Sequence, residues 1–162
     1  MAKIHINIGS NQNRRSNIST AIEALKLNFL TTQFSDVFVS PAYGFKGDDF
    51  YNVGVNASTD LPIDGVIEVL HFIENNQGRD RAQAKFSSRL IDLDLVLYDG
   101  VVDAKYNLPR GDILKHNFVL LPLAQLSPAG IHPLAKKTYL ELSATLNRLK
   151  SYNIEILNRT KK

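Results

Sequence analysis

Two stretches of the chain alternate apolar and polar residues with a period of two, which is typical of half-buried β-strands, and a third is a short apolar run. Residues 3–8 place an isoleucine at every second position, residues 36–39 form a shorter apolar run, and residues 50–57 alternate throughout. A turn composition follows the first stretch at residues 9–13. These stretches predict three strands, each with one apolar side.

Two further stretches repeat apolar residues at helical spacing, which predicts helices with one buried side. Asn17 is the predicted N-cap of the first helix. Asp60 or Pro62 opens the second, which is expected to stop at Gly78. The apolar positions are Ile18, Ile22, Leu25 and Phe29 in the first helix and Ile63, Val66, Ile67, Leu70 and Ile73 in the second.

The last third of the chain has weaker patterns. It predicts a helical turn at residues 112–115, a buried helix at residues 118–126 and a further helix at residues 138–149. A late strand is expected within residues 154–157, and residues 159–162 are expected to be frayed.

A fourth strand is predicted at residues 89–97, and it carries two acids inside an apolar run. Because successive strand side chains point to opposite faces, Asp92 and Asp94 stand side by side, roughly 6.5–7 Å apart along the strand. That spacing suits one divalent cation, or two ions that bind a phosphate chain. A solvated outer face of an edge strand is the alternative explanation. The residues expected on the core side are Ile91, Leu93, Leu95 and Leu97.

The segment just before these acids is rich in cations, namely Arg79, Arg81, Lys85 and Arg89. Guanidinium groups bind phosphate oxygens in pairs. Acids that hold a metal beside cations that bind phosphate are the parts of a phosphoryl-transfer site. The neighbourhood therefore favours that chemistry over a solvated acidic face.

The predicted order of elements is strand, helix, strand, strand, helix, strand. This order indicates an α+β fold of the ferredoxin-like type, with an antiparallel sheet and helices on one face. Asp99-Gly100 predicts a hairpin return after the fourth strand. The chain has 162 residues, of which 44% are hydrophobic, and no repeat or linker divides it. Residues 1–162 are therefore expected to form a single domain around one core.

Composition excludes several kinds of site. The chain has no cysteine, which removes disulfides, thiolate zinc sites and cysteine nucleophiles and suits a reducing compartment. No apolar run approaches the roughly 20 residues needed to span a bilayer, so we expect a cytoplasmic protein without a membrane partner. The net charge of +3 and the pI near 9.1 allow nucleic-acid binding. Cations concentrated beside Asp92 suit a phosphorylated small molecule equally well.

Other candidate contacts are less specific. The chain has no P-loop or dinucleotide fingerprint, and the four histidines lack metal-ligand spacing. Glu74 lies near the end of the second predicted helix, four positions before Gly78. Its side chain either points toward the cations or is an exposed acid. Phe50 and Phe118 stand at segment edges, where an aromatic ring packs in the core or stacks on a flat heterocycle. Asn52 shares the side of Phe50 and offers an amide to such a ring.

An ordered series of these residues resembles the 6-hydroxymethyl-7,8-dihydropterin pyrophosphokinase family of folate biosynthesis. The resemblance covers roughly residues 4–133. It rests on Ile8-Gly9-Ser10-Asn11, Ser40-Pro41 followed by Gly44, Asp49-Phe50-Tyr51-Asn52, Glu74 with Gly78-Arg79, Arg89 with Asp92-Leu93-Asp94, Leu108-Pro109, Phe118-Val119-Leu120-Leu121-Pro122-Leu123 and Ser127-Pro128.

The resemblance implies transfer of the terminal pyrophosphate of ATP to the hydroxymethyl group of a reduced pterin, with two Mg²⁺ ions on a ferredoxin-like scaffold. It also implies a monomer with small-molecule substrates and no nucleic-acid partner. Asp92 and Asp94 are the implied metal ligands and, with Arg79, Arg81 and Arg89, the implied catalytic residues. The implied pterin contacts are Ser40, Tyr43, Phe50, Asn52 and Phe118, and the implied ATP contacts are Glu74, Arg79, Arg89, Arg110 and His116.

Two short segments and two single residues differ from the usual family pattern. Phe86-Ser87-Ser88 stands in place of Trp-Gly-Pro, and Lys46-Gly47-Asp48-Asp49 lacks the usual Gln-Pro. Arg110 replaces the histidine after Pro109, and His116 stands at or near the place of a phosphate-binding arginine. Two alternatives to the enzyme therefore stay open. One is a non-catalytic or altered-substrate relative that binds a pterin, and the other is an RNA-binding ferredoxin-like module.

Overall fold

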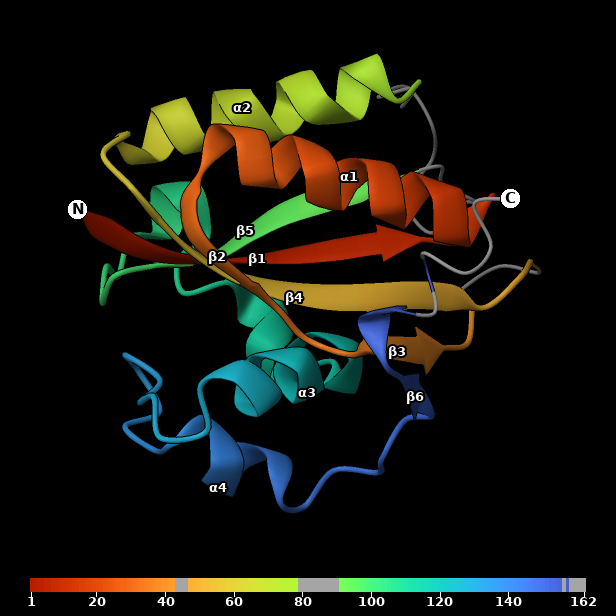
Figure 1. The fold of residues 1–162 in the computed structure, drawn as a ribbon. Coiled ribbons are helices and arrows are strands. Elements are labelled where there is room, and N and C mark those ends of the chain that lie inside the picture. The colour runs from red at the N-terminus through yellow and green to blue at the C-terminus, as the bar shows by residue number, and fades with distance from the viewer. Residues whose placement is uncertain (43–46, 79–90, 156, 158–162) are drawn as a thin grey trace.

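Six strands form one antiparallel sheet at the centre of the molecule (Figure 1). The computed structural model describes residues 1–42, 47–78, 91–155 and 157. The sheet order is β5-β1-β4-β3-β6, and β2 also pairs with β4. The predicted ferredoxin-like α+β class is confirmed. The strands are β1 (Ala2–Ser10), β2 (Leu30–Phe34), β3 (Val37–Ser40), β4 (Phe50–Thr59), β5 (Asp92–Tyr98) and β6 (Ser151–Tyr152).

Helices α1 (Arg14–Asn28) and α2 (Ile63–Asn76) cover one face of this sheet (Figure 1). Their apolar stripes meet the apolar sides of β1, β4 and β5 in the main core, where Ile6 and Leu25 are fully buried. Gly78 has a φ of 86° directly after α2, so the predicted helix stop is confirmed.

Helices α3 (Asn117–Leu126) and α4 (Tyr139–Ser143) lie on the opposite face of the sheet (Figure 1). The expectation of helices on one face only is therefore wrong. Val96 of β5 is fully buried among α3 residues in a second core. Gly54 allows α3 to approach β4, since a Cβ built there would lie 2.8 Å from Pro122 Cβ.

A β-bulge changes which side of β5 faces the main core. Leu95 pairs with Ile6 and Leu97 pairs with His5, so β5 advances two residues while β1 advances one. Leu93 and Leu95 are buried in the main core as predicted, whereas Leu97 packs against the second core. The prediction that Leu97 shares their side is wrong, because alternation is reset at the bulge.

The first helix and the second strand differ from the predicted boundaries. Helix α1 begins at Arg14, not after Asn17, and its N-cap is Asn13 in the left-handed region, a conformation that asparagine tolerates. Strand β2 follows α1 at once and was not predicted, because its polar residues at 31–33 hide the alternation.

The C-terminal predictions are only partly confirmed. A turn forms at Asp99, but no strand returns from it in the described residues. Helix α4 ends at Ser143, well before residue 149, although Leu146 still packs on the second core without a helix. Strand β6 precedes the predicted late strand, and Leu157 is buried in the main core. Residues 156 and 159–162 lie outside the described part.

Two short 3-10 helices, η1 (Ala104–Tyr106) and η2 (Gly111–Leu114), connect β5 to α3. Helix η2 confirms the predicted helical turn within one residue, and α3 confirms the predicted buried helix. In the ranges that the structure describes, no helix combines the length and apolarity needed to cross a membrane.

Candidate active site

The two aspartates of β5 lie on the sheet face that α3 covers. Strand register places Asp92 beside Gly9 and Asp94 beside Asn7 of β1. The alternation predicted for this part of the strand is confirmed, because Leu93 between them is buried in the main core. Each carboxylate is only partly exposed, so the acids are not a freely solvated outer face.

A cavity of about 350 Å³ opens where these aspartates meet α3 and η2. Many of the residues that the sequence predicts as site residues line this cavity. Those that line it are Ser40, Phe50, Asn52, Asp92, Asp94, Arg110, His116 and Phe118. A larger hollow of about 680 Å³ lies elsewhere on the molecule and includes neither aspartate.

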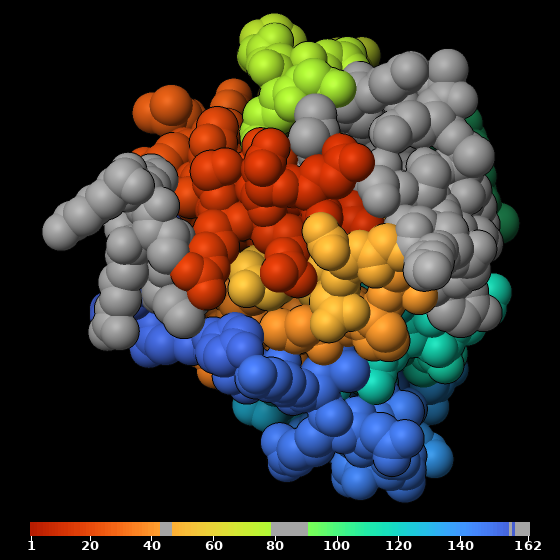
Figure 2. Space-filling view, turned by 90° about the vertical axis from the view of Figure 1, so that its right-hand side faces the viewer, coloured from red at the N-terminus to blue at the C-terminus, as the bar shows by residue number. Residues whose placement is uncertain are grey.

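The N-terminal turn packs against the segment that leads into this cavity. Asn11 Nδ2 donates to the carbonyl of Asp48 at 3.2 Å, and Arg14 donates to the carbonyl of Asp49 at 2.7 Å. The Arg14 guanidinium also lies 4.2 Å from the ring centroid of Tyr51. Figure 2 shows the N-terminal residues (red) directly against residues near 50 (yellow-orange) on this side of the molecule. These contacts fix the start of β4, and hence Phe50.

Part of the cavity lining is aromatic and amide-bearing. Phe50 of β4 and Phe118 of α3 both line it, and His116 stacks on Phe118 with centroids 4.9 Å apart. Asn52 Nδ2 donates to Ser40 Oγ at 2.9 Å and to the Phe38 carbonyl at 3.1 Å. Because these bonds hold the amide by its nitrogen, its oxygen is left to accept from a ligand.

The cavity lining also has an acidic part, Asp92 and Asp94. Burial and the neighbouring Asp92 raise the pKa of Asp94 to about 7, against the opposing effect of Arg110. With Arg110 close by, Asp94 is therefore only partly ionised near neutral pH, and a further cation would favour its carboxylate form. Repulsion between paired acids is what a bound divalent cation relieves.

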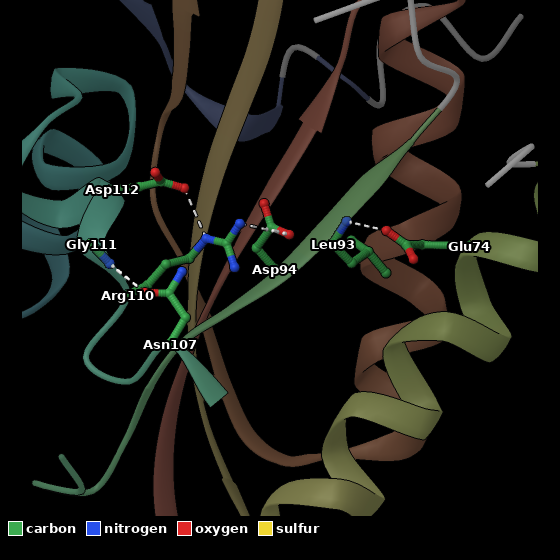
Figure 3. Close-up of polar contacts among 7 residues, drawn as sticks. All are labelled: Glu74, Leu93, Asp94, Asn107, Arg110, Gly111 and Asp112. Atoms are coloured by element: carbon green, nitrogen blue, oxygen red, sulfur yellow. Dashed lines mark hydrogen bonds and ion pairs between the residues drawn. The ribbon is translucent and has the colours of Figure 1, made fainter. Parts of the chain in front are cut away.

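Arg110 is the cation close to Asp94. Its Nη2 lies 3.6 Å from Asp94 Oδ1, and its Nε donates to Asp112 Oδ2 at 2.8 Å (Figure 3). Burial opposes its charge, yet Asp94 and Asp112 raise the pKa of Arg110 above its usual value. The sequence nominated Arg110 as an ATP contact, and the structure brings it into the cavity.

Asn7 is a cavity residue that sequence reasoning missed. It is buried next to Asp94, and its Oδ1 has no hydrogen-bond partner among the described residues. A buried acceptor without a partner costs about 1–3 kcal/mol. A polar residue in an otherwise isoleucine-rich strand was the available signal, but alternation explained it as a solvent-facing position.

The donor set fits a metal that completes its shell from a substrate. No group of three or more His, Cys, Asp or Glu able to hold a metal occurs among the described residues. Two carboxylates and the Asn7 oxygen are too few to enclose an ion. Mg²⁺ typically takes one or two carboxylates and fills its remaining positions with water and substrate phosphates.

Glu74 lies on the other side of β5. It is buried, so the expectation of an exposed helix acid is wrong, and its Oε2 accepts the backbone N–H of Leu93 at 2.8 Å (Figure 3). It is not among the residues lining the cavity. Its nomination as an ATP contact stays a prediction from the resemblance.

Several nominated residues fall outside the described part of the chain. They are Tyr43 of the pterin loop and Arg79, Arg81 and Arg89 of the basic segment. Conversely, the cavity contains Asn107, Asp112 and Lys115, which were not nominated. Their roles depend on how residues 103–116 fold back over β5, which no local pattern encodes.

The sequence model of the family described as "7,8-dihydro-6-hydroxymethylpterin-pyrophosphokinase (HPPK)" matches residues 5–128. The chain belongs to the HPPK family. This membership confirms the enzyme class expected from the sequence, a pyrophosphokinase that acts on a hydroxymethyldihydropterin. The matched residues include both aspartates and every cavity residue named above.

Related proteins agree with this assignment. The 2-amino-4-hydroxy-6-hydroxymethyldihydropteridine pyrophosphokinase of Aquifex aeolicus is 32% identical over 156 residues, or 94% of this chain and 96% of that protein. A protein of the same name from Methylorubrum extorquens is 31% identical over 79% of this chain and 84% of its own length. The Folic acid synthesis protein FOL1 of Dictyostelium discoideum is 30% identical over 91% of this chain, which spans 22% of that protein.

Proposed function

We propose that this HPPK-family chain transfers the β,γ-pyrophosphate of ATP to the hydroxymethyl group of 6-hydroxymethyl-7,8-dihydropterin. The observation that carries the proposal is one cavity whose lining combines two kinds of residue. Phe50, Phe118 and Asn52 supply aromatic rings and an amide, and Asp92 and Asp94 supply carboxylates. A flat heterocycle and a metal-bound phosphate chain need these two kinds of lining next to each other.

The pterin ring is expected to stack between Phe50 and Phe118, with its polar edge toward Asn52. Offset stacking on an aromatic ring contributes roughly 0.5–1.5 kcal/mol beyond the area buried. Asn52 Oδ1 then accepts from an N–H of the ring, since its nitrogen is already bonded to Ser40 and Phe38. This arrangement fixes the hydroxymethyl group at the acidic part of the lining.

Asp92 and Asp94 would hold the two Mg²⁺ ions, with Asn7 Oδ1 adjacent to Asp94. When bound, the ions would neutralise phosphate charge and align the triphosphate with the pterin hydroxyl. Arg110, Lys115 and His116 surround the same space and would contact phosphate oxygens. Arg79, Arg81 and Arg89 are proposed to complete these contacts.

The reaction requires one bond to form and one to break. The hydroxymethyl oxygen attacks the β-phosphorus, the bond from that phosphorus to the α,β-bridging oxygen breaks, and AMP leaves with the electron pair. The hydroxyl proton passes to solvent. No covalent nucleophile is needed, so positioning and charge neutralisation by the cavity residues suffice.

AMP release from ATP in the presence of the dihydropterin and Mg²⁺ tests this proposal. Asp94→Asn should lower turnover at least about a hundredfold while the protein stays folded, because it removes a carboxylate charge that would bind Mg²⁺. Asp60→Asn, which alters an exposed acid before α2, is the matched control and should retain turnover. No AMP above background from the unmodified protein would refute the proposal.

The non-catalytic alternative predicts pterin binding without AMP formation. Calorimetry with the dihydropterin, followed by the AMP assay on the same sample, separates the two possibilities. The RNA-binding alternative is disfavoured by the position of α3, which packs on the sheet face where such modules stack bases.

A further inference from the structure

Arg110 lies between two acids, Asp94 and Asp112. Its guanidinium is 3.6 Å from Asp94 and hydrogen-bonded to Asp112 at 2.8 Å (Figure 3). All three side chains are about 30% exposed, at 28%, 29% and 32% respectively. Ion pairs shielded to this degree are screened less by solvent than fully exposed ones.

The backbone fixes this position from both sides. The Arg110 N–H donates to the carbonyl of Val96, which links it to the bulge of β5. Asn107 Oδ1 accepts from the N–H of Gly111 at 3.1 Å and shapes the start of η2 (Figure 3). These backbone contacts of residues 110 and 111 therefore hold the guanidinium beside Asp94.

We propose that Arg110 is a resident counter-cation for Asp94 that a divalent cation must displace, and that the displaced guanidinium then binds the nucleotide phosphates. The inference rests on the proposed function, since it assigns Asp94 to the metal. It adds a second state of Arg110 to the phosphate contact that the sequence implied.

Electrostatics requires the displacement. Asp94 Oδ1 lies 3.6 Å from the guanidinium, and a divalent ion bound there would repel a positive charge a few Å away. Asp112 holds the same guanidinium through Nε, so Arg110 keeps an anionic partner while it turns from Asp94. Phosphate oxygens offer the planar guanidinium two acceptors at once.

The consequence is that the binding of metal and the binding of nucleotide are coupled. Without nucleotide, metal binding must break the pair between Arg110 and Asp94 and is weak. With nucleotide, the phosphates accept the guanidinium, so metal and nucleotide favour each other. The cavity is therefore expected to bind a divalent cation weakly in the absence of nucleotide.

Titration of the full chain with Mn²⁺ at pH 8, without nucleotide and followed by calorimetry, tests the inference. Arg110→Gln should bind Mn²⁺ about tenfold more tightly than the unmodified protein, a change equivalent to about 1.4 kcal/mol. Arg110→His should behave likewise, because histidine is neutral at pH 8. Lys115→Gln removes an exposed cation from the same cavity and should change the affinity less than about threefold.

A second measurement separates this role from a structural one. With Mn²⁺ saturating, Arg110→Gln should bind a non-hydrolysable ATP analogue about tenfold more weakly. Opposite changes in the two affinities support the inference, because a misfolded variant would lose both. Equal or weaker Mn²⁺ binding by both Arg110 variants overturns it. AMP release by the unmodified protein is measured separately, so failure of this inference does not count against the enzyme activity.

Discussion

His5 of β1 lies among groups that leave its imidazole little access to water. It is 2% exposed, Asn56 Oδ1 lies 2.7 Å from its Nδ1, and its buried Nε2 has no hydrogen-bond partner in the part of the chain that the structure describes. Burial lowers the pKa of His5 to about 4, although the bond to Asn56 opposes the shift. His5 is therefore neutral in the folded protein at neutral pH.

This pKa makes stability depend on pH. In the unfolded chain His5 has its ordinary pKa of 6.5, so between about pH 6.5 and 4 the unfolded state binds the proton more tightly. Titration of His5 should therefore lower the free energy of unfolding by about 2 kcal/mol between pH 7.5 and pH 5. Asp94, whose pKa is raised, acts in the opposite direction over this range, so the contribution of His5 is measured as the difference between the wild-type protein and a variant without this histidine.

Urea unfolding of the wild-type protein and of His5→Gln at these two pH values measures the effect. Glutamine does not titrate, so the variant should lose most of this pH dependence. His132, whose pKa is also lowered by burial, contributes equally to both proteins and cancels in the comparison. An unchanged pH dependence in His5→Gln would rule out this account.

At the scale of elements, the edge strand β5 is held by a helix side chain. Its inner edge pairs with β1, which leaves backbone N–H groups of the outer edge without a strand partner. Glu74 of α2 accepts one of these, the N–H of Leu93. Leu93 lies between the two aspartates, so the same bond sets the position of both carboxylates.

Glu74→Ala should therefore lower the free energy of unfolding by about 1–3 kcal/mol, because a buried backbone donor loses its acceptor. Glu74→Gln keeps an acceptor oxygen and should lose less. Glu68→Ala, an exposed acid on the same helix, is the control and should stay within about 0.5 kcal/mol of the wild type. Urea unfolding of the three variants measures these changes. Equal losses of unfolding free energy in Glu74→Ala and Glu68→Ala would show that the hydrogen bond from Leu93 to Glu74 does not stabilise the fold.

At the scale of the whole molecule, two cores enclose the sheet. The main core joins it to α1 and α2, and the second joins it to α3 and α4. The cavity lies at the start of β4 and β5, and its lining combines Phe118 of α3 with the two aspartates of the sheet. Ligands that bind both parts of this lining must tie the two layers together.

Substrate binding should therefore stabilise the folded chain as a unit. The dihydropterin at a hundred times its dissociation constant, in the presence of Mg²⁺ and a non-hydrolysable ATP analogue, should add about 2.7 kcal/mol. For a chain of about this size, this raises the melting temperature by roughly 5–10 °C. Thermal denaturation with and without EDTA measures the shift, and EDTA should remove most of it.

A single-stranded RNA oligonucleotide is the control ligand in the same experiment. It should leave the melting temperature unchanged, because α3 covers the sheet face that RNA-binding modules use. Stabilisation by RNA that persists in EDTA and disappears with salt would instead favour the RNA-binding alternative.

The sequence by itself determined the parts of this protein that neighbouring residues encode. Period-two and helical spacings located four of the six strands and all four α-helices of the described residues at least approximately, although α4 is shorter than predicted, and the alternation around Leu93 paired Asp92 with Asp94. The motifs that resemble the HPPK family identified the enzyme class before the fold was known. Each of these signals lies within a few residues along the chain.

Only the tertiary structure decided how distant segments meet. The bulge that turns Leu97 over, the packing of α3 on the second face, and the burial of Glu74 against Leu93 all depend on register and docking between separate elements. The pairing of Arg110 with Asp94 likewise arises because residues 103–116 fold back over β5. Such contacts are chosen by the free energy of the assembled layers, which local periodicity does not specify.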